Sequence, residues 1–304
     1  MIRAAFVAAM LALCVPAVAS AQTEAIYDPN TPPPGANDWS CKPTAEHPNP
    51  VVLVHGLSAN AEANWYWMAP KIEAAGYCVY ALTYGRQPTN PPPFNYNGGL
   101  KPMEDSVLEL SAFVDRVLSA TGAQKVDIVG HSEGSLMPDY YLRYVPNARY
   151  SDGPLQGELK VQRYVGMTPL WDGTDPGGLV TFSESDPTPF THYFIQGMSY
   201  ACASCPEFMH DSDFLNKMKA NGGPRVPGVD YTMIMTTHDE LVHPYTSGHM
   251  DGANNIVLQD QCPADPSEHL ALAANPNALR DVLNALDPEH SKLAVDCTTL
   301  LQYQ

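Results

Sequence analysis

The residues most able to do chemistry stand in the pentapeptide Gly130-His131-Ser132-Glu133-Gly134. A serine between two glycines fits the G-x-S-x-G pattern of a nucleophile on a sharp strand-to-helix turn, where glycines remove side chains that would collide. The pentapeptide alone is a weak signal, because glycine and serine are both common. Its surroundings strengthen it, since the apolar run 126–129 precedes it directly and a helix-like segment follows. We therefore interpret Ser132 as a nucleophile rather than as part of an ordinary glycine-rich loop.

A serine hydroxyl is a weak nucleophile, so it needs a base, and the base needs a carboxylate that orients it. Where a nucleophile stands on such a turn, the chain order is serine, acid, histidine. The strand-like run YTMIMTT is followed closely by Asp239, with Glu240 as the nearest rival, whereas Asp230 precedes that strand. His269 stands in a loop between the last predicted strand and the closing helix. We predict a triad of Ser132, His269 and Asp239; the alternative for Asp239 is a solvated loop acid.

The tetrahedral intermediate of such a reaction carries an oxyanion, which needs N–H donors that already point at it. One donor is expected to be the backbone N–H of Glu133, at the start of the helix after the nucleophile. The other is expected to be the N–H of Leu57, because the buried-strand run VVLV leads into His55-Gly56. The glycine lets the chain turn there, so that the next N–H points inward.

The elements that must position these residues alternate between strands and helices, which predicts an α/β fold with a doubly wound, mostly parallel sheet of about six strands. The segment 170–229 is too long for a plain connection, and we interpret it as a cap over the sheet. Asn275 is a predicted N-cap, with Pro276 at the first helical position. Apolar runs and helical periodicity predict strands at 51–54, 78–82, 126–129, 161–167, 231–237 and 255–259, and helices at 59–75, 103–120, 133–144 and 276–286.

The chain begins with the layout of a secretory signal peptide: one early charge at Arg3, an apolar run, and the small residues Ala19-Ser20-Ala21. We assign residues 1–21 to this signal and residues 22–304 to a single domain in a secreted protein, extracellular or periplasmic. A membrane anchor is the alternative, but the apolar run is short for a span and no second run follows. The net charge of −17 repels nucleic acid and anionic membranes, which excludes a nucleic-acid role.

Six cysteines remain beyond the predicted signal, and an even number in a secreted chain predicts disulfides without fixing their pairing. Cys202 and Cys205 have C-x-x-C spacing. We favour a local disulfide there over a zinc site, which would need two further ligands at suitable spacing.

The stretches HPNPVVLVHG, Asn64-Trp65, GYCVYALTYG, VDIVGHSEGS, GVDYTMIMTTHDELVHPY and the late Cys262 to His269 segment form a recognisable set. On these stretches, and over nearly its whole length beyond residue 21, the chain resembles the class-two triacylglycerol lipases, secreted bacterial enzymes of the α/β-hydrolase fold. The resemblance implies carboxylic ester hydrolysis through an acyl-enzyme, with Ser132, Asp239 and His269 as the triad, and a sheet that lacks the first strands of the fold. In such a fold the disulfide Cys41–Cys78 would tie down the segment before the first strand, residues 22–50, which we call the leader. The disulfide Cys262–Cys297 would fasten the His269 loop to the C-terminal tail.

Several functions stay open within this resemblance. The leading one is a lipase; the alternatives are a carboxylesterase of short soluble or polymeric esters, an acyltransferase or peptidase with the same triad, and a non-catalytic binding protein. Trp65 is a candidate substrate contact, with a core aromatic as the alternative. We expect a monomer that acts on ester or lipid substrates, including at an oil–water interface, without nucleic acid or a membrane-spanning segment in the mature chain. No EF-hand loop or H-E-x-x-H motif is present, so we expect no cofactor and no metal.

Overall fold

Six parallel strands form one sheet in the computed structural model, which describes residues 31–90, 94–175 and 199–298. Their order across the sheet is β2-β1-β3-β4-β5-β6. The direction of strand addition reverses beside β1 and β3, and doubly wound sheets hold their ligands at the carboxyl ends of strands at such a switch point. The strands are β1 (Val51–Val54), β2 (Val79–Leu82), β3 (Val126–His131), β4 (Val161–Met167), β5 (Asp230–Met235) and β6 (Asn254–Val257).

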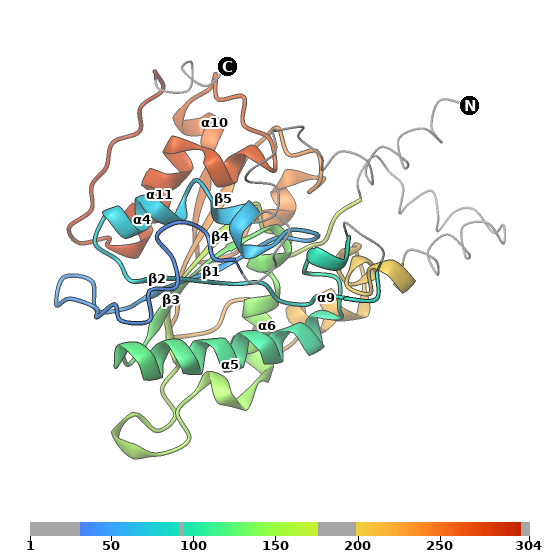
Figure 1. The fold of residues 1–304 in the computed structure, drawn as a ribbon. Helices are drawn as coiled ribbons and strands as arrows, with labels where there is room; N and C mark the ends of the chain where they lie inside the picture. The colour runs from blue at the N-terminus through green and yellow to red at the C-terminus, as the bar shows by residue number, and fades with distance from the viewer. Residues whose placement is uncertain (1–30, 91–93, 176–198, 299–304) are drawn as a thin grey trace, which may run out of the picture.

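Helices cover both faces of the sheet (Figure 1). On one face lie α5 (Met103–Thr121) and α6 (Met137–Tyr144), and on the other lie α4 (Ala69–Ala74) and α11 (Pro276–Leu286). The shorter helices are α3 (Ala61–Trp65), α9 (Asp213–Lys219) and α10 (Leu258–Gln261). Single 3₁₀ turns are η1 (Phe94–Tyr96), η2 (Ser132–Ser135), η3 (Pro146–Ala148), η4 (Gly153–Leu155), η6 (Cys205–Phe208), η7 (Ala220–Gly222), η8 (Tyr245–Gly248) and η9 (Ala271–Ala274).

The apolar run of β1 supplies both cores, because successive side chains of a strand point to opposite faces. Val52 and Val54 belong to the core on the α5–α6 side, while Val51 and Leu53 belong to the core on the α4–α11 side. All four side chains are fully buried. None of the helices that the structure describes is long and apolar enough to cross a membrane.

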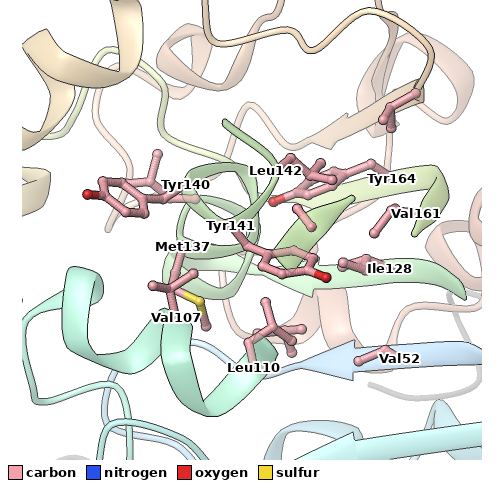
Figure 2. Close-up of a cluster of buried hydrophobic side chains, with 14 of the residues drawn as sticks. Val52, Val107, Leu110, Ile128, Met137, Tyr140, Tyr141, Leu142, Val161 and Tyr164 are labelled. Carbon is pink, nitrogen blue, oxygen red and sulfur yellow. The ribbon is translucent and has the colours of Figure 1, made fainter. Parts of the chain in front are cut away.

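The core on the α5–α6 side is rich in tyrosine (Figure 2). Tyr141 of α6 packs there with Leu110 of α5 and Ile128 of β3. The buried hydroxyl of Tyr164, on β4, donates a 2.7 Å hydrogen bond to the Ser135 carbonyl oxygen. A buried tyrosine needs such a partner for its hydroxyl. This contact ties the turn η2, which follows β3, to the neighbouring strand.

Several predicted elements have different bounds in the structure. The single helix expected at 59–75 is divided into α3 and α4, because Pro70 lacks an N–H and its ring would clash within an uninterrupted helix. The helix expected from Glu133 begins as the 3₁₀ turn η2, and α6 follows with Pro138 in its first turn. The strands expected at 231–237 and 255–259 each end two residues early, at Met235 and Val257. After the second of them, Leu258 opens α10.

The leader before β1 covers the edge strand β2. Asn37 has a left-handed φ of 62°. Its side-chain amide donates to the Ala81 carbonyl oxygen at 2.9 Å and accepts from the Ala81 N–H at 2.8 Å. The disulfide Cys41–Cys78 joins the leader to the residue before β2. The leader therefore covers part of the backbone edge of β2, which would otherwise be free to pair with another chain.

The predicted cap lies partly outside the described residues, because the structure does not describe 176–198, and the predicted signal peptide 1–21 lies wholly outside them. The described part of 170–229 contains α9 and the disulfide Cys202–Cys205. Phe214 of α9 stacks on Tyr140 of α6 with 5.5 Å between ring centroids. This part therefore packs against the α5–α6 side of the core, and a cap over the sheet stays a prediction.

Asp139 of α6 makes stability depend on pH. Its side chain is fully buried and accepts a 2.6 Å hydrogen bond from the Tyr231 hydroxyl. Burial raises the pKa of this carboxyl from 3.8 to about 7. In the unfolded chain the group ionises near pH 3.8, so the free energy of unfolding should fall as the pH rises from about 4 to about 7.

Asp139→Asn should remove this pH dependence. We expect a gain in stability over wild type that grows to on the order of 2–4 kcal/mol above neutral pH and vanishes near pH 4. Urea unfolding at several pH values measures it, with the exposed Asp152→Asn as the control that shows no such trend. A stability difference that stays constant across the pH range would contradict the assignment.

Candidate active site

Ser132 follows β3 directly and takes a left-handed backbone conformation with φ of 57°. The two glycines of the pentapeptide allow this turn through close backbone contacts. A methyl group on Gly130 would lie 2.0 Å from the Gly134 carbonyl oxygen, and one on Gly134 would lie 2.2 Å from the Val54 carbonyl oxygen. Because backbone atoms cannot move away cheaply, only glycine fits at these two positions. The serine side chain is held at the carboxyl end of the sheet in a strained conformation of the kind found at active sites.

Asp239 and His269 are in contact, although they lie in different loops. The Nδ1 atom of His269 is 2.9 Å from each carboxylate oxygen of Asp239. Asp239 Oδ1 also accepts hydrogen bonds from the N–H groups of Leu241, at 3.0 Å, and Val242, at 2.7 Å. Both side chains are almost fully buried. A carboxylate facing Nδ1 favours the tautomer with its proton on Nδ1, which leaves Nε2 free to accept one.

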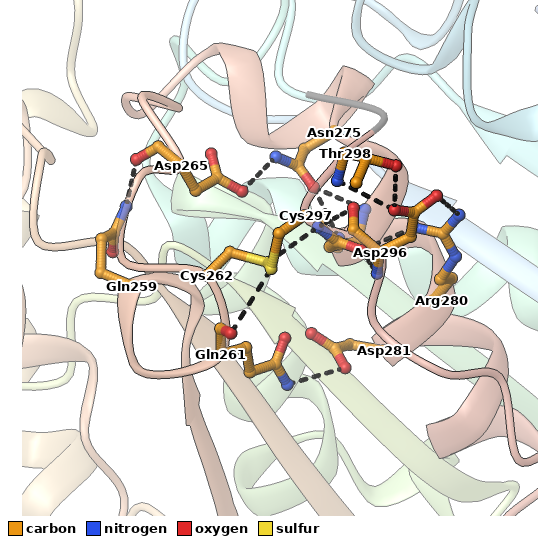
Figure 3. Close-up of a disulfide and its surroundings, with 12 residues drawn as sticks. Gln259, Gln261, Cys262, Asp265, Asn275, Arg280, Asp281, Asp296, Cys297 and Thr298 are labelled. Atoms are coloured by element: carbon orange, nitrogen blue, oxygen red, sulfur yellow. Dashed lines mark hydrogen bonds and ion pairs between the residues drawn. A yellow bond between two sulfur atoms is a disulfide. The ribbon is translucent and has the colours of Figure 1, made fainter. Parts of the chain in front are cut away.

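The loop that carries His269 is braced on both sides (Figure 3). Asn275 donates to Asp265 Oδ2 at 2.9 Å, and Gln259 donates to the Asp265 carbonyl oxygen at 3.1 Å. The disulfide Cys262–Cys297 joins the beginning of this loop to the C-terminal segment. These contacts fix the loop between α10 and α11, so the position of His269 does not depend on its bond to Asp239 alone.

His131, which our sequence reasoning did not assign, joins three parts of the site. Its Nε2 lies 3.0 Å from the carbonyl oxygen of His269, and its Nδ1 lies 3.0 Å from Asn64 Oδ1. Asn64 Oδ1 also accepts the N–H of Gly56 at 3.0 Å. Burial lowers the pKa of His131 to about 3. One side chain thus connects the residue before Ser132 with the histidine loop and with the loop after β1; its place in the pentapeptide was the only signal in the sequence.

The loop after β1 lies against the nucleophile. A methyl group on Gly56 would be 3.1 Å from Ser132 Cβ, so the backbone here passes directly beside the serine. The N–H of Ser58 donates to the Gly98 carbonyl oxygen at 3.0 Å, which holds the turn that contains Leu57. Within the described part of the chain, neither the N–H of Leu57 nor that of Glu133 donates a hydrogen bond. Both are therefore available to an acceptor beside Ser132.

Two further residues considered from the sequence, Glu240 and Trp65, lie at the surface and in the core, respectively. Glu240 is exposed, and its pKa is raised by partial burial and by the neighbouring Glu268. Trp65 is fully buried in the core on the α4–α11 side, edge-on to the His131 ring with 6.4 Å between centroids. This burial supports the alternative that Trp65 is a core aromatic. Among the residues that the structure describes, no group of three or more His, Cys, Asp or Glu side chains could hold a metal ion.

Solved structures with a similar fold include two lipases. Lipase B of Aspergillus fumigatus superposes with a TM-score of 0.61 at 18% identity, covering 88% of this chain and 59% of that one. The mature form of the Bacillus licheniformis lipase BlEst2 superposes with a TM-score of 0.54 at 14% identity, covering 80% of this chain and 94% of that one. At these identities the likeness shows the fold, which is that of the α/β-hydrolases.

Sequence comparisons identify the family. Triacylglycerol lipases of Pseudarthrobacter phenanthrenivorans and Burkholderia plantarii are each 34% identical over 102 residues. That alignment covers 32% of this chain and 29% and 26% of the two relatives, so the chain matches less than a third of their length. A family model described as lipase (class 2) matches residues 48–279, which is most of the chain and includes the nucleophile turn, Asp239 and His269. The chain belongs to the class 2 lipase family.

Proposed function

We propose that this protein hydrolyses carboxylic esters through a triad of Ser132, His269 and Asp239, and that its substrates are triacylglycerols. The observation that carries the proposal is the contact of His269 Nδ1 with both oxygens of Asp239, at 2.9 Å. The His269 carbonyl oxygen is in turn hydrogen-bonded to His131, the neighbour of Ser132. Membership of the class 2 lipase family and the two triacylglycerol lipase relatives support the substrate class.

The chemistry proceeds in two acyl transfers. Ser132 Oγ attacks the ester carbonyl carbon, and its proton passes to His269 Nε2. The carbonyl oxygen becomes an oxyanion that accepts hydrogen bonds from the N–H groups of Leu57 and Glu133. The C–O bond to the alcohol breaks, and the alcohol leaves with the proton from His269. Water then attacks the acyl-enzyme in the same way and releases the acid, which restores Ser132.

We place this activity outside the cytoplasm. Three disulfides, at Cys41–Cys78, Cys202–Cys205 and Cys262–Cys297, support folding in an oxidising compartment, because such bonds are rare in the cytosol. The signal-like first 21 residues point the same way. We expect a monomer in solution, which a sedimentation measurement checks.

Hydrolysis of nitrophenyl esters from butanoate to palmitate, and of emulsified triacylglycerol, tests the proposal with Ser132→Ala alongside. Activity on emulsified long-chain esters that is lost in the variant supports a lipase. Activity on short soluble esters alone identifies a carboxylesterase. Release of acyl product only when an alcohol acceptor is added identifies a transferase, and no turnover at all would favour a binding protein and contradict the proposal.

Chelation of metal should leave the rate unchanged, because every step is assigned to side chains and backbone groups of this chain. Hydrolysis after dialysis against EDTA should match that of the untreated protein, with a calcium-supplemented sample as the comparison. A loss that calcium restores would show that a cation supports the site.

A further inference from the structure

Glu133 is a buried acid directly after Ser132. Its side chain is 1% exposed, and its Oε1 lies 3.1 Å from the hydroxyl oxygen of Tyr84. Its Oε2 is buried and has no hydrogen-bond partner among the residues that the structure describes. A carboxylate with an unpaired oxygen in such a place is costly, since burying an ionised group without donors carries a large penalty.

The hydroxyl groups beside Glu133 already donate their protons elsewhere. The Tyr84 hydroxyl is 2.9 Å from the His55 carbonyl oxygen, which can only accept. The Ser204 hydroxyl lies beside Glu133 and donates to the Gly99 carbonyl oxygen at 2.5 Å. Each hydroxyl has one proton to donate. The contact between Tyr84 and Glu133 is therefore satisfied when Glu133 itself carries a proton and donates it to Tyr84.

An ionised Glu133 would fit this arrangement poorly. If Tyr84 donated to a carboxylate, the His55 carbonyl would lose its hydrogen bond and Oε2 would still have no donor. Among the residues that the structure describes, the charged group that acts on Glu133 is another acid, Glu207 in η6. The rings of His55 and His131 are buried, with pKa values lowered to about 4 and about 3. Burial accordingly raises the pKa of Glu133 well above its usual value.

Glu133 lies close to the loop that carries Leu57, with Gly99 between them. A methyl group on Gly99 would lie 3.0 Å from Glu133 Oε1 and 3.1 Å from Leu57 Cα, so Gly99 is packed between them. The Gly99 N–H donates to the Tyr84 carbonyl oxygen at 2.8 Å. Glu133, Tyr84 and Gly99 thus form a closed set of contacts, and Gly99 connects this set to Leu57 in the loop after β1.

We propose that Glu133 is a positioning residue that works as an uncharged carboxylic acid: it donates to Tyr84, and through Tyr84 and Gly99 it holds the Leu57 N–H in place for the oxyanion. This role rests on the proposed ester hydrolysis. Loss of the proton removes the hydrogen bond to Tyr84 and puts a negative charge beside the two N–H groups that stabilise the oxyanion. Hydrolysis therefore declines at alkaline pH when Glu133 ionises.

The test is the pH dependence of tributyrin hydrolysis from about pH 6 to about pH 10, followed by titration of the released acid. Wild type, Glu133→Gln and Glu133→Ala are compared. Glutamine can donate from its amide to Tyr84 but cannot ionise. We expect Glu133→Ala to lower kcat on the order of tenfold to a hundredfold with little change in KM, because misplaced oxyanion donors affect the transition state. Glu133→Gln should restore most of that loss and abolish the alkaline decline.

The matched control is Glu158→Gln, since Glu158 is an exposed acid that pairs with Lys125 at 3.3 Å and precedes β4 at the opposite end of the strands. It should reproduce the wild-type profile. Thermal unfolding measures the effect of Glu133 on the fold separately from its effect on the rate. The unfolding midpoint of Glu133→Gln minus that of wild type should increase with pH, because position 133 can ionise in wild type and cannot in the variant.

Two outcomes overturn the inference while leaving the hydrolysis intact. One is an alkaline decline in Glu133→Gln that matches wild type, and the other is a Glu133→Gln variant as impaired as Glu133→Ala at neutral pH, which would show that the negative charge is needed. A wild type that hydrolyses no ester at any pH would contradict the proposed function itself, and the positioning role with it.

Discussion

Ser132→Ala should lower kcat for the hydrolysis of p-nitrophenyl butanoate by on the order of a millionfold, the scale seen when a triad nucleophile is removed. The reason is that the acyl-enzyme cannot form without the Ser132 oxygen. The variant keeps the two N–H donors and the binding surface, so a small acceleration over the reaction in water should persist. Steady-state kinetics with purified protein measure the loss.

The fold should tolerate this substitution. Ser132 is already in a left-handed conformation, and alanine faces a similar backbone strain there, so we expect the unfolding midpoint to change by no more than a few degrees. Ser40→Ala, at an exposed position in the leader, is the matched control and should keep the wild-type rate. A Ser132→Ala variant that retains more than about a hundredth of the wild-type rate would remove the serine from its assigned role.

Asp239→Asn should lower kcat by on the order of ten thousandfold. The asparagine carbonyl oxygen can still accept the N–H groups of Leu241 and Val242, so the turn is preserved. Its amide would face His269 Nδ1 and favour the tautomer with the proton on Nε2. That tautomer cannot accept the proton of Ser132, so the loss should appear in kcat and not in the fold.

Glu240→Gln is the control that separates the two candidate acids. Glu240 is exposed and interacts with Glu268, so its substitution should change kcat by less than about tenfold. The reverse result, with a loss under about tenfold in Asp239→Asn and a large loss in Glu240→Gln, would transfer the role to Glu240.

The sheet could be predicted because its strands β1, β2 and β3 are buried along their whole length. A run such as VVLV in β1 has no polar residue to confuse its assignment, and all four side chains are fully buried. The turn at Ser132 could also be predicted, because the residues that it requires are close together in the sequence. Gly130 and Gly134 must lack side chains where the strand and the following turn pass each other. Parallel strand order then places Asp239 and His269 at the same edge as Ser132.

What the sequence did not reveal depends on contacts between distant segments. The side chain of Glu133 lies where Tyr84, Gly99 and Ser204 come together, and no local pattern predicts that meeting. The bridge that His131 makes to Asn64 and to the His269 carbonyl is of the same kind. The break between α3 and α4 is different, since Pro70 is visible in the sequence and a proline does not fit the interior of an uninterrupted helix.

The most direct test of the account is to find where a p-nitrophenyl alkylphosphonate attaches, because such a probe forms a stable tetrahedral adduct only with an activated nucleophile. Intact-mass and peptide analysis should show one adduct per chain, on Ser132. The adduct should be absent in Ser132→Ala and form much more slowly in Asp239→Asn. A wild-type protein that hydrolyses esters but carries the adduct on another residue, or none at all, would contradict the account.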